Sequence, residues 1–192
     1  MPASRRRLLD ASPRQLGLYI FFGSLTVLFG ASIVAYLITR AQTPMWRAPG
    51  MAGLPSGLWL STALALSISA SLESARRAVR ANRSQALTQR LWLALILVVA
   101  FLLAQVENWM GMRQTEQSAS VQSLFPYTFY LLTGLHALHV LGGLVPLTLT
   151  LVRAVRREYS SSNHEGLNLC SQYWHFLGIV WVVLFTTLEL GA

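Results

Sequence analysis

The 192-residue chain contains no lysine, a single cysteine and few charged residues of any kind. Charged residues make up 11% of the sequence, whereas a soluble domain of this length carries roughly 25%. The scarcity of charge excludes an ordinary water-facing surface, so most of the surface must face lipid. The single cysteine, Cys170, excludes an internal disulfide.

All 15 basic residues are arginine, and with 7 acidic residues they give a net charge of +8. A positive charge of this size is found in nucleic-acid-binding proteins, but here the arginines lie between long apolar segments. That pattern is typical of membrane topology, so we expect no nucleic-acid partner.

Long hydrophobic runs are what the sequence has in abundance, with 54% hydrophobic residues. A membrane helix needs about 20 mostly apolar residues. Five segments meet this requirement, at about residues 16–39, 57–75, 91–110, 125–152 and 170–190. The connections are short, so the sequence predicts an all-α fold in which residues 1–192 form one membrane domain, a bundle of five transmembrane helices. The first span is too long for a signal peptide.

Arginines are distributed unequally between the two sides that these spans define. One side holds twelve of them: Arg5, Arg6, Arg7, Arg14, Arg76, Arg77, Arg80, Arg83, Arg90, Arg153, Arg156 and Arg157. The other side holds Arg40, Arg47 and Arg113. Because cytoplasmic loops carry the excess of basic residues, the N-terminus is predicted to be cytoplasmic and the C-terminus outside.

Three histidines inside the spans are candidates for haem or metal ligands, proton carriers or packing residues. His136 and His139 are three residues apart near the middle of the fourth span, so they share a helix face. His175 lies nearer to the inner end of the fifth span, a depth that suits a shared haem poorly. Zinc or copper requires three or four ligands. We therefore expect neutral imidazoles bonded across helix interfaces, with Tyr159 or the loop around Asn163 as partner of His175.

Acidic residues inside the spans are the second kind of candidate, since an intramembrane carboxylate is costly. Glu107, next to Gln105 and Asn108, is predicted to face the outer half of the fourth span. Glu73 is predicted to pair with Arg76 or Arg77, one helical turn away.

Three segments carry a family resemblance: FLLAQVENW (101–109), TFYLLTGLHALHVLGG (128–143) and SNHEGLNLCSQYWHFLGIVWVVLF (162–185). They resemble subunit III of the haem-copper oxidases, whose typical forms are FLxxQxxEY, TGxHGLHVxxG and YWHFVDVVWLFLF in the same order. The resemblance is strong over the last three spans and weaker but collinear over the first two. It implies the five-helix form of the cytochrome c and quinol oxidase subunit III family.

This resemblance implies an accessory, non-redox subunit of a bacterial terminal oxidase, which acts in aerobic respiration and is no enzyme on its own. Haem and copper would belong to the partner subunit I, against which this subunit packs, and the chain would hold structural phospholipid in the cytoplasmic membrane. The residues expected at structural or interface positions are Glu107, His136, His139, Trp174 and His175. Those expected to meet lipid headgroups are Arg76, Arg77 and Arg80.

The chain departs from the family pattern at three positions. Gly23 falls where many members carry a glutamate, Gly178 replaces the aspartate of the last motif, and Ala137 replaces a glycine. The two lost carboxylates call into question a role in proton uptake. Alternatives are an accessory subunit of a nitric oxide reductase, a small membrane cytochrome and a solute transporter, although the broken helices and repeats of transporters are not found.

Overall fold

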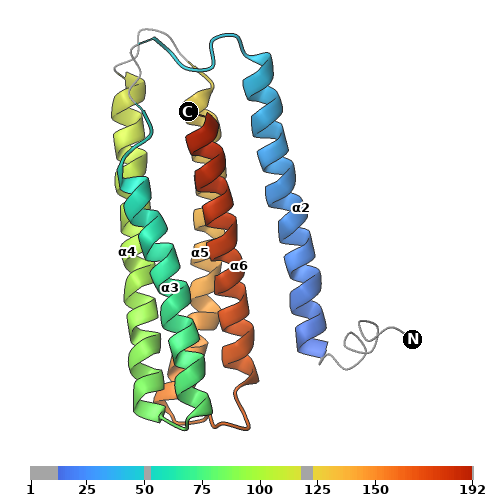
Figure 1. Ribbon diagram of the computed structural model, residues 1–192, viewed down its shortest axis with the longest axis vertical. Helices are drawn as coiled ribbons and strands as arrows, with labels where there is room; N and C mark the ends of the chain where they lie inside the picture. The colour runs from blue at the N-terminus through green and yellow to red at the C-terminus, as the bar shows by residue number, and fades with distance from the viewer. Residues whose placement is uncertain (1–12, 50–52, 118–122, 192) are drawn as a thin grey trace, which may run out of the picture.

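The computed structural model describes residues 13–49, 53–117 and 123–191, and within them helices are the only regular secondary structure (Figure 1). The helices are α2 (Pro13–Gln42), α3 (Gly57–Arg80), α4 (Ser84–Gln117), α5 (Phe125–Val155) and α6 (Glu165–Gly191). All five are long and apolar enough to cross a membrane, which confirms the predicted five-span, all-α fold. Arg5, Arg6 and Arg7 lie outside the described residues.

Each helix except α3 and α5 begins before its predicted span, and each helix ends after it. The largest difference is in α4, which begins at Ser84 and ends at Gln117, whereas the apolar run covers only about residues 91–110. The extra turns are polar and contain Arg90 and Arg113. Hydrophobicity defines the part of a helix that lies in hydrocarbon, while its backbone bonds continue into the headgroup region.

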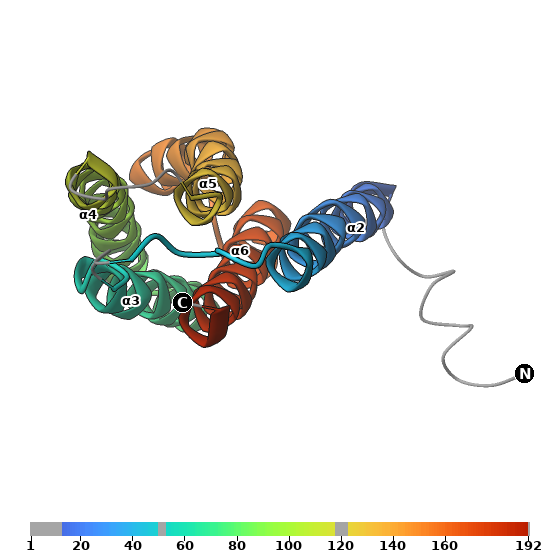
Figure 2. The same ribbon diagram turned by 90° about the horizontal axis from the view of Figure 1, so that it is seen from above.

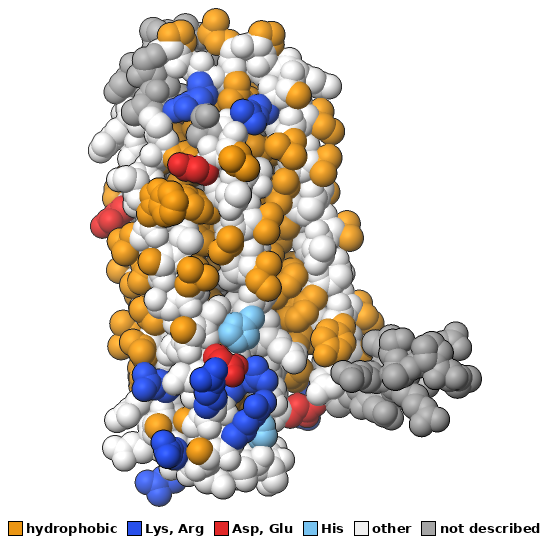
Figure 3. All heavy atoms as spheres, viewed as in Figure 1, with side chains coloured by type: hydrophobic (Ala, Val, Ile, Leu, Met, Phe, Trp, Pro, Cys, Tyr) orange, Lys and Arg blue, Asp and Glu red, His pale blue; other side chains and the backbone are white. Residues whose placement is uncertain are grey.

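Four helices, α3 to α6, form a compact bundle, and α2 lies at its edge beside α6 (Figure 2). In agreement with this view, α2 packs mainly against α6 and α5, whereas α3 and α4 share the most extensive interface. Consecutive helices run in opposite directions. The α3–α4 turn, the α5–α6 loop and the start of α2 therefore lie at one end, which we call the arginine-rich end. Figure 3 shows the basic side chains towards the two ends and hydrophobic side chains between them.

The tight α3–α4 turn depends on a left-handed residue. Asn82 has a φ of 53°, and its amide donates to the carbonyl of Val79 at the end of α3. Asparagine is one of the few residues with a side chain that tolerates this conformation. The turn brings α3 and α4 together as antiparallel neighbours, and Ser71 Oγ donates to the Arg90 carbonyl across them at 2.8 Å.

Large aromatic side chains are among the fully buried residues of the bundle. Phe101, Phe125, Phe129 and Trp181 are each at most 1% exposed, whereas Ile20, Leu138 and many other aliphatic residues are exposed and face outwards. Both the inside and the outside are thus apolar, as expected of a bundle in lipid. The hydrophobic effect does not drive association of such helices, so close packing and interhelical hydrogen bonds must hold them together.

Three side-chain hydrogen bonds each join a different pair of helices. Asn108 Nδ2 donates to Ser61 Oγ at 3.1 Å between α4 and α3. Trp109 Nε1 donates to Thr133 Oγ1 at 3.0 Å between α4 and α5. The third, from Trp181 Nε1 to Thr62 Oγ1 at 3.0 Å, joins α6 and α3. Each is expected to contribute about 0.6 kcal/mol, with a maximum near 1.7 kcal/mol.

Candidate functional site

His136 lies at the centre of the four-helix bundle. Its side chain is 2% exposed, and its ring lies 5.1 Å from that of Trp181 and 5.8 Å from that of Phe101. Its Nδ1 has no hydrogen-bond partner among the described residues. An imidazole enclosed by aromatic rings in this way is poorly placed to carry a charge, because burial disfavours the charged form.

His139, one turn further along α5, faces a different part of the molecule. Its Nδ1 lies 2.8 Å from the carbonyl of Leu135 in the same helix, and its ring lies 5.2 Å from that of Phe29 on α2. Its own carbonyl accepts a 2.7 Å hydrogen bond from the Tyr173 hydroxyl on α6. A carbonyl cannot donate, so the bond to Leu135 fixes the proton on Nδ1 and leaves Nε2 as an acceptor.

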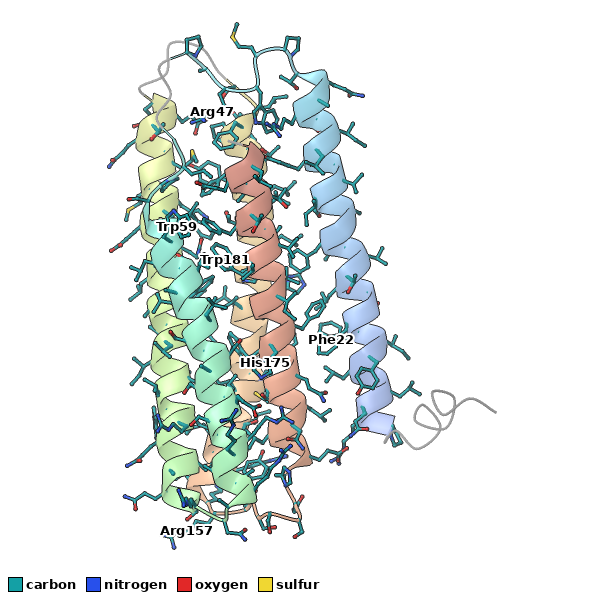
Figure 4. The ribbon with its side chains drawn as sticks, viewed as in Figure 1. Phe22, Arg47, Trp59, Arg157, His175 and Trp181 are labelled. Atoms are coloured by element: carbon teal, nitrogen blue, oxygen red, sulfur yellow. The ribbon has the colours of Figure 1, made fainter. Side chains whose placement is uncertain are left out.

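His175 lies at another level of the bundle, nearer to the arginine-rich end than Trp181 on the same helix (Figure 4). His136 is level with Trp181, and six residues of α6 at 1.5 Å each place His175 about 9 Å away along the bundle. The charged residues that interact electrostatically with His175 are Glu73 and Arg76 on α3. The predicted contact of His175 with Tyr159 is wrong, because Tyr159 lies beside Gly166, nine residues earlier.

Glu107 also differs from its predicted placement. Its side chain is exposed on the outer surface of α4, and it has no ion pair within the described part of the chain. Successive residues of a helix are 100° apart, and the neighbours Asn108 and Trp109 are the ones that face α3 and α5. The expectation that Glu107 faces α5 is therefore corrected: its side chain points away from the other helices of this chain.

The acidic and basic groups near the arginine-rich end of α3 pair with one another. Glu73 lies 3.0 Å from Arg76 and 3.5 Å from Arg77, so the predicted ion pair is confirmed with both arginines. Arg76 Nε also donates to Asn168 Oδ1 on α6 at 3.1 Å. Arg80, one turn further along α3, is exposed. Arg76 thus joins α3 to α6, which leaves it less free to meet a lipid headgroup than Arg80.

A large groove runs between α2, α5 and α6, and we call it the α2 groove. Its volume is about 470 Å³. Its walls are mostly apolar, with Leu18 and Phe21 from α2, Leu138 and Leu149 from α5, and Leu169 from α6. The groove exists because α2 packs along the edge of the bundle and leaves space beside α5.

The charged side chain in the lining of the α2 groove lies near the arginine-rich end. Arg153 and Tyr159 line it there, and both approach Gly166 at the start of α6. Pro146, further along α5, has no amide proton, so the carbonyl of Gly142 loses its normal helical donor, and both residues line the groove. The groove therefore offers one cation, Arg153, and several uncharged polar side chains beside an apolar surface.

Trp174 holds α6 against α5. It is 2% exposed, and it packs with Tyr173 over Gly143, where a Cβ would lie 2.7 Å from Tyr173 Cε1 and 3.0 Å from Trp174 Cζ2. Only glycine lets the two helices approach so closely.

Within the described residues, no three histidine, cysteine, aspartate or glutamate side chains lie close enough together to hold a metal ion. Asn108, Trp109 and Trp181 bond neighbouring helices. The predicted bonds of the imidazoles across helix interfaces are not observed, because His136 Nδ1 has no partner among the described residues and His139 Nδ1 bonds its own helix. The class of protein is thus a multi-pass helical membrane protein.

Comparison with known sequences gives the family. The family described as "Cytochrome c oxidase subunit III" matches residues 14–190, and the chain belongs to this family. Cytochrome c oxidase subunit 3 of Thermostichus vulcanus is 28% identical over 177 residues, which cover 91% of this chain and 86% of that protein. The subunit 3 of Alkalihalophilus pseudofirmus is 29% identical over 187 residues, covering 96% and 90%. That of Spodoptera frugiperda is 30% identical over 129 residues, covering 67% and 85%.

Sequence reasoning missed several of the groups that join the helices. Aligned with the form FLxxQxxEY, the family glutamate falls on Asn108 and not on Glu107. Asn108 is 3% exposed and bonded to α3. The motif register, read residue by residue, was the signal that could have identified it. The same register places Trp109 at the aromatic position of that form, whereas Thr62 lies outside the three motif segments and gave no comparable signal.

Proposed function

We propose that this chain is the accessory, non-redox subunit of a bacterial cytochrome c-type terminal oxidase, and that it stabilises the catalytic subunit I and holds a phospholipid beside it. Haem and copper would be bound by the partner, and the chain would lie in the cytoplasmic membrane. Membership of the subunit III family is the observation that carries the proposal. The relatives' names favour cytochrome c over quinol as the electron donor, and oxygen over nitric oxide as the substrate.

The orientation rests on the arginine-rich end. It holds nine of the twelve arginines in the described helices and loops, and under the positive-inside rule this excess supports a cytoplasmic location for that end. Glu107 then lies towards the outside, on the surface of α4, where a polar group of a partner subunit could cover it. His136 and Trp174 are buried and His139 and His175 are partly buried, and we assign none of them a step in the chemistry.

The test is co-purification of the tagged chain from its native membrane. We expect it to retain a haem-containing partner and oxygen consumption with reduced cytochrome c, and we expect the chain to lose the haem spectrum once detergent separates it. Retention of haem by the separated chain, lost in His139→Ala, would contradict the proposal. Nitric oxide consumption without oxygen consumption would favour the reductase alternative.

The role of the buried histidine can be tested in the same complex. His136→Ala should weaken assembly, because its removal leaves a cavity among aromatic rings. A complex that still contains all its subunits should show a nearly normal initial rate. If such a complex lost most of its initial turnover, His136 would have to be assigned to proton delivery or to the chemistry.

Phospholipid is the ligand that best suits the α2 groove. An acyl chain would lie along the leucines, and a phosphate would reach Arg153 and the Tyr159 hydroxyl at the cytoplasmic end. Hydrocarbon gains little by leaving the bilayer, so retention must come from the headgroup, at roughly 1 kcal/mol for each basic residue. Native mass spectrometry should thus show about fivefold weaker retention for Arg153→Gln.

Arg80→Gln is the matched variant. Arg80 is exposed at the same end but lies on α3, away from the groove, with Arg76 and Arg77. If Arg80→Gln releases lipid and Arg153→Gln does not, the headgroup binds the α3 arginines, as expected from the sequence, and not the groove.

A further inference from the structure

A small internal cavity separate from the α2 groove lies at the centre of the bundle. Its volume is about 10 Å³, and it is lined by residues of α3, α4, α5 and α6. Its walls are apolar side chains and glycine, except for the imidazole of His136 and the indole of Trp174. A volume of about 10–15 Å³ is what one ordered water needs.

Each of the two polar residues in its wall has a ring nitrogen that lacks a hydrogen-bond partner. His136 and Trp174 are each 2% exposed, and neither His136 Nδ1 nor Trp174 Nε1 has a hydrogen-bond partner among the described residues. Buried polar groups in proteins are nearly always paired, by protein atoms or by water. In hydrocarbon no bulk solvent can supply the missing partner, so the requirement is stronger than in a soluble protein.

The indole of Trp174 and the imidazole of His136 have hydrogen-bonding requirements that one water molecule between them can meet. The indole N–H can only donate, and a neutral imidazole protonated on Nε2 can only accept at Nδ1. A water molecule can accept from the first and donate to the second at once. No anion or cation fits, because the remaining walls are apolar and carry no charge.

Gly178 is a further residue of interest in the wall of this cavity. It lines the cavity on α6, at the position where the resembling subunit III sequences carry an aspartate. A Cβ at this position would lie 3.0 Å from Ser69 Oγ on α3. A glycine here removes a side chain from the centre of the bundle and with it a group that could bond its neighbours.

We propose that one ordered water occupies this cavity and bridges His136 on α5 to Trp174 on α6, as a permanent part of the bundle. The water takes the place of a small polar side chain, because it hydrogen-bonds both buried rings and so links α5 to α6. It also explains how a chain without the aspartate keeps the surrounding histidine and tryptophan.

The proposal predicts the sign of a cavity-filling substitution. Val140→Ile adds one methylene to a residue in the cavity wall. In a dry apolar cavity this change would be neutral or stabilising. If it displaces a bridging water, two buried groups lose their partner, and the unfolding equilibrium should shift by about 5- to 150-fold towards the unfolded state.

Two further variants remove the effect of simple overpacking. Val98→Ile enlarges a valine that is 0% exposed but does not line the cavity, and its effect measures overpacking alone. In a His136→Phe background the acceptor is absent, so Val140→Ile should shift the unfolding equilibrium much less than in the unchanged chain. Stability is measured on the purified complex by denaturant titration of this subunit's dissociation and unfolding.

A cryo-EM map of the complex at a resolution that shows waters gives the second readout. We expect a density peak in the cavity within hydrogen-bonding distance of both rings, and its loss in Val140→Ile. A cavity without density, or a stabilising Val140→Ile in the unchanged chain, would overturn the proposal. Equal shifts for Val140→Ile with His136 and with Phe at that position would overturn it as well.

Discussion

Gly143 is the position at which one added methyl group should be most damaging to the α5–α6 interface. A Cβ there would lie 2.7 Å from Tyr173 Cε1, 3.0 Å from Trp174 Cζ2 and 3.3 Å from Trp174 Cε2. Real Cβ atoms do not approach ring atoms so closely, so Gly143→Ala must move the rings or separate the helices. Neither ring moves easily, because Tyr173 is held by its 2.7 Å hydrogen bond to the His139 carbonyl and Trp174 is 2% exposed.

The magnitude of this effect follows from overpacking, which costs typically about 1–3 kcal/mol in a well-packed core. Alanine is also intrinsically favoured over glycine in a helix interior, by about 1 kcal/mol. Gly134→Ala in the same helix separates the two terms, since its Cβ would meet nothing within 4 Å. Both substitutions make the same gain in propensity, so their difference in stability is the overpacking alone.

The assay is the free energy of unfolding of both variants in the same lipid or detergent. We expect Gly134→Ala to match or exceed the unchanged chain and Gly143→Ala to lie about 1–3 kcal/mol below Gly134→Ala. Equal stabilities of the two variants would refute the reasoning, because they would show that the interface can open at Gly143 without loss.

Three further experiments test the polar side chains. Thr62→Val keeps the shape of the side chain but leaves the buried indole N–H of Trp181 without its acceptor, so it should lower the free energy of unfolding by about 1–3 kcal/mol; an unchanged denaturation midpoint would count against this bond. A double-mutant cycle of Asn108→Leu and Ser61→Ala should give a coupling energy of about 0.6–1.7 kcal/mol, and a coupling of zero would rule the contact out. Glu107→Gln should change the stability of the separated chain by less than about 0.5 kcal/mol, because the side chain is exposed, but should reduce retention of the subunit in the purified complex. A marked loss of stability in the separated chain would place Glu107 inside the bundle instead.

The helices could be predicted from the sequence because a membrane imposes one simple requirement, about 20 apolar residues. Their ends could not be predicted in the same way. Residues 84–90 are polar enough to read as a loop, yet they form the first two turns of α4. The antiparallel turn at Asn82 allows α4 to begin there, and that turn depends on a backbone conformation that hydropathy does not report.

Burial was harder to predict than helix position. In a soluble protein, hydrophobic periodicity tells which face of a helix is inside. In lipid both faces of a helix are apolar, so the hydrophobic pattern around Glu107 and Asn108 did not show which of the two side chains faces the bundle. Glu107, the acidic one, was wrongly placed inside. His136 was placed correctly at mid-helix, but its neighbours Phe101 and Trp181 come from helices whose rotation the sequence does not specify.

The edge position of α2 has a consequence for biosynthesis. The helix that leaves the ribosome first among the five packs mainly against α6 and α5, the last two to be made. Trp46, just after α2, donates its indole N–H to the carbonyl of Gly191, 145 residues later. At about 5–20 residues per second, synthesis of that length takes roughly 7–30 s. During this interval α3 and α4 can already pair. The helix α2, in contrast, lies in the bilayer without its partners α5 and α6 and is accessible to chaperones, proteases and other membrane helices.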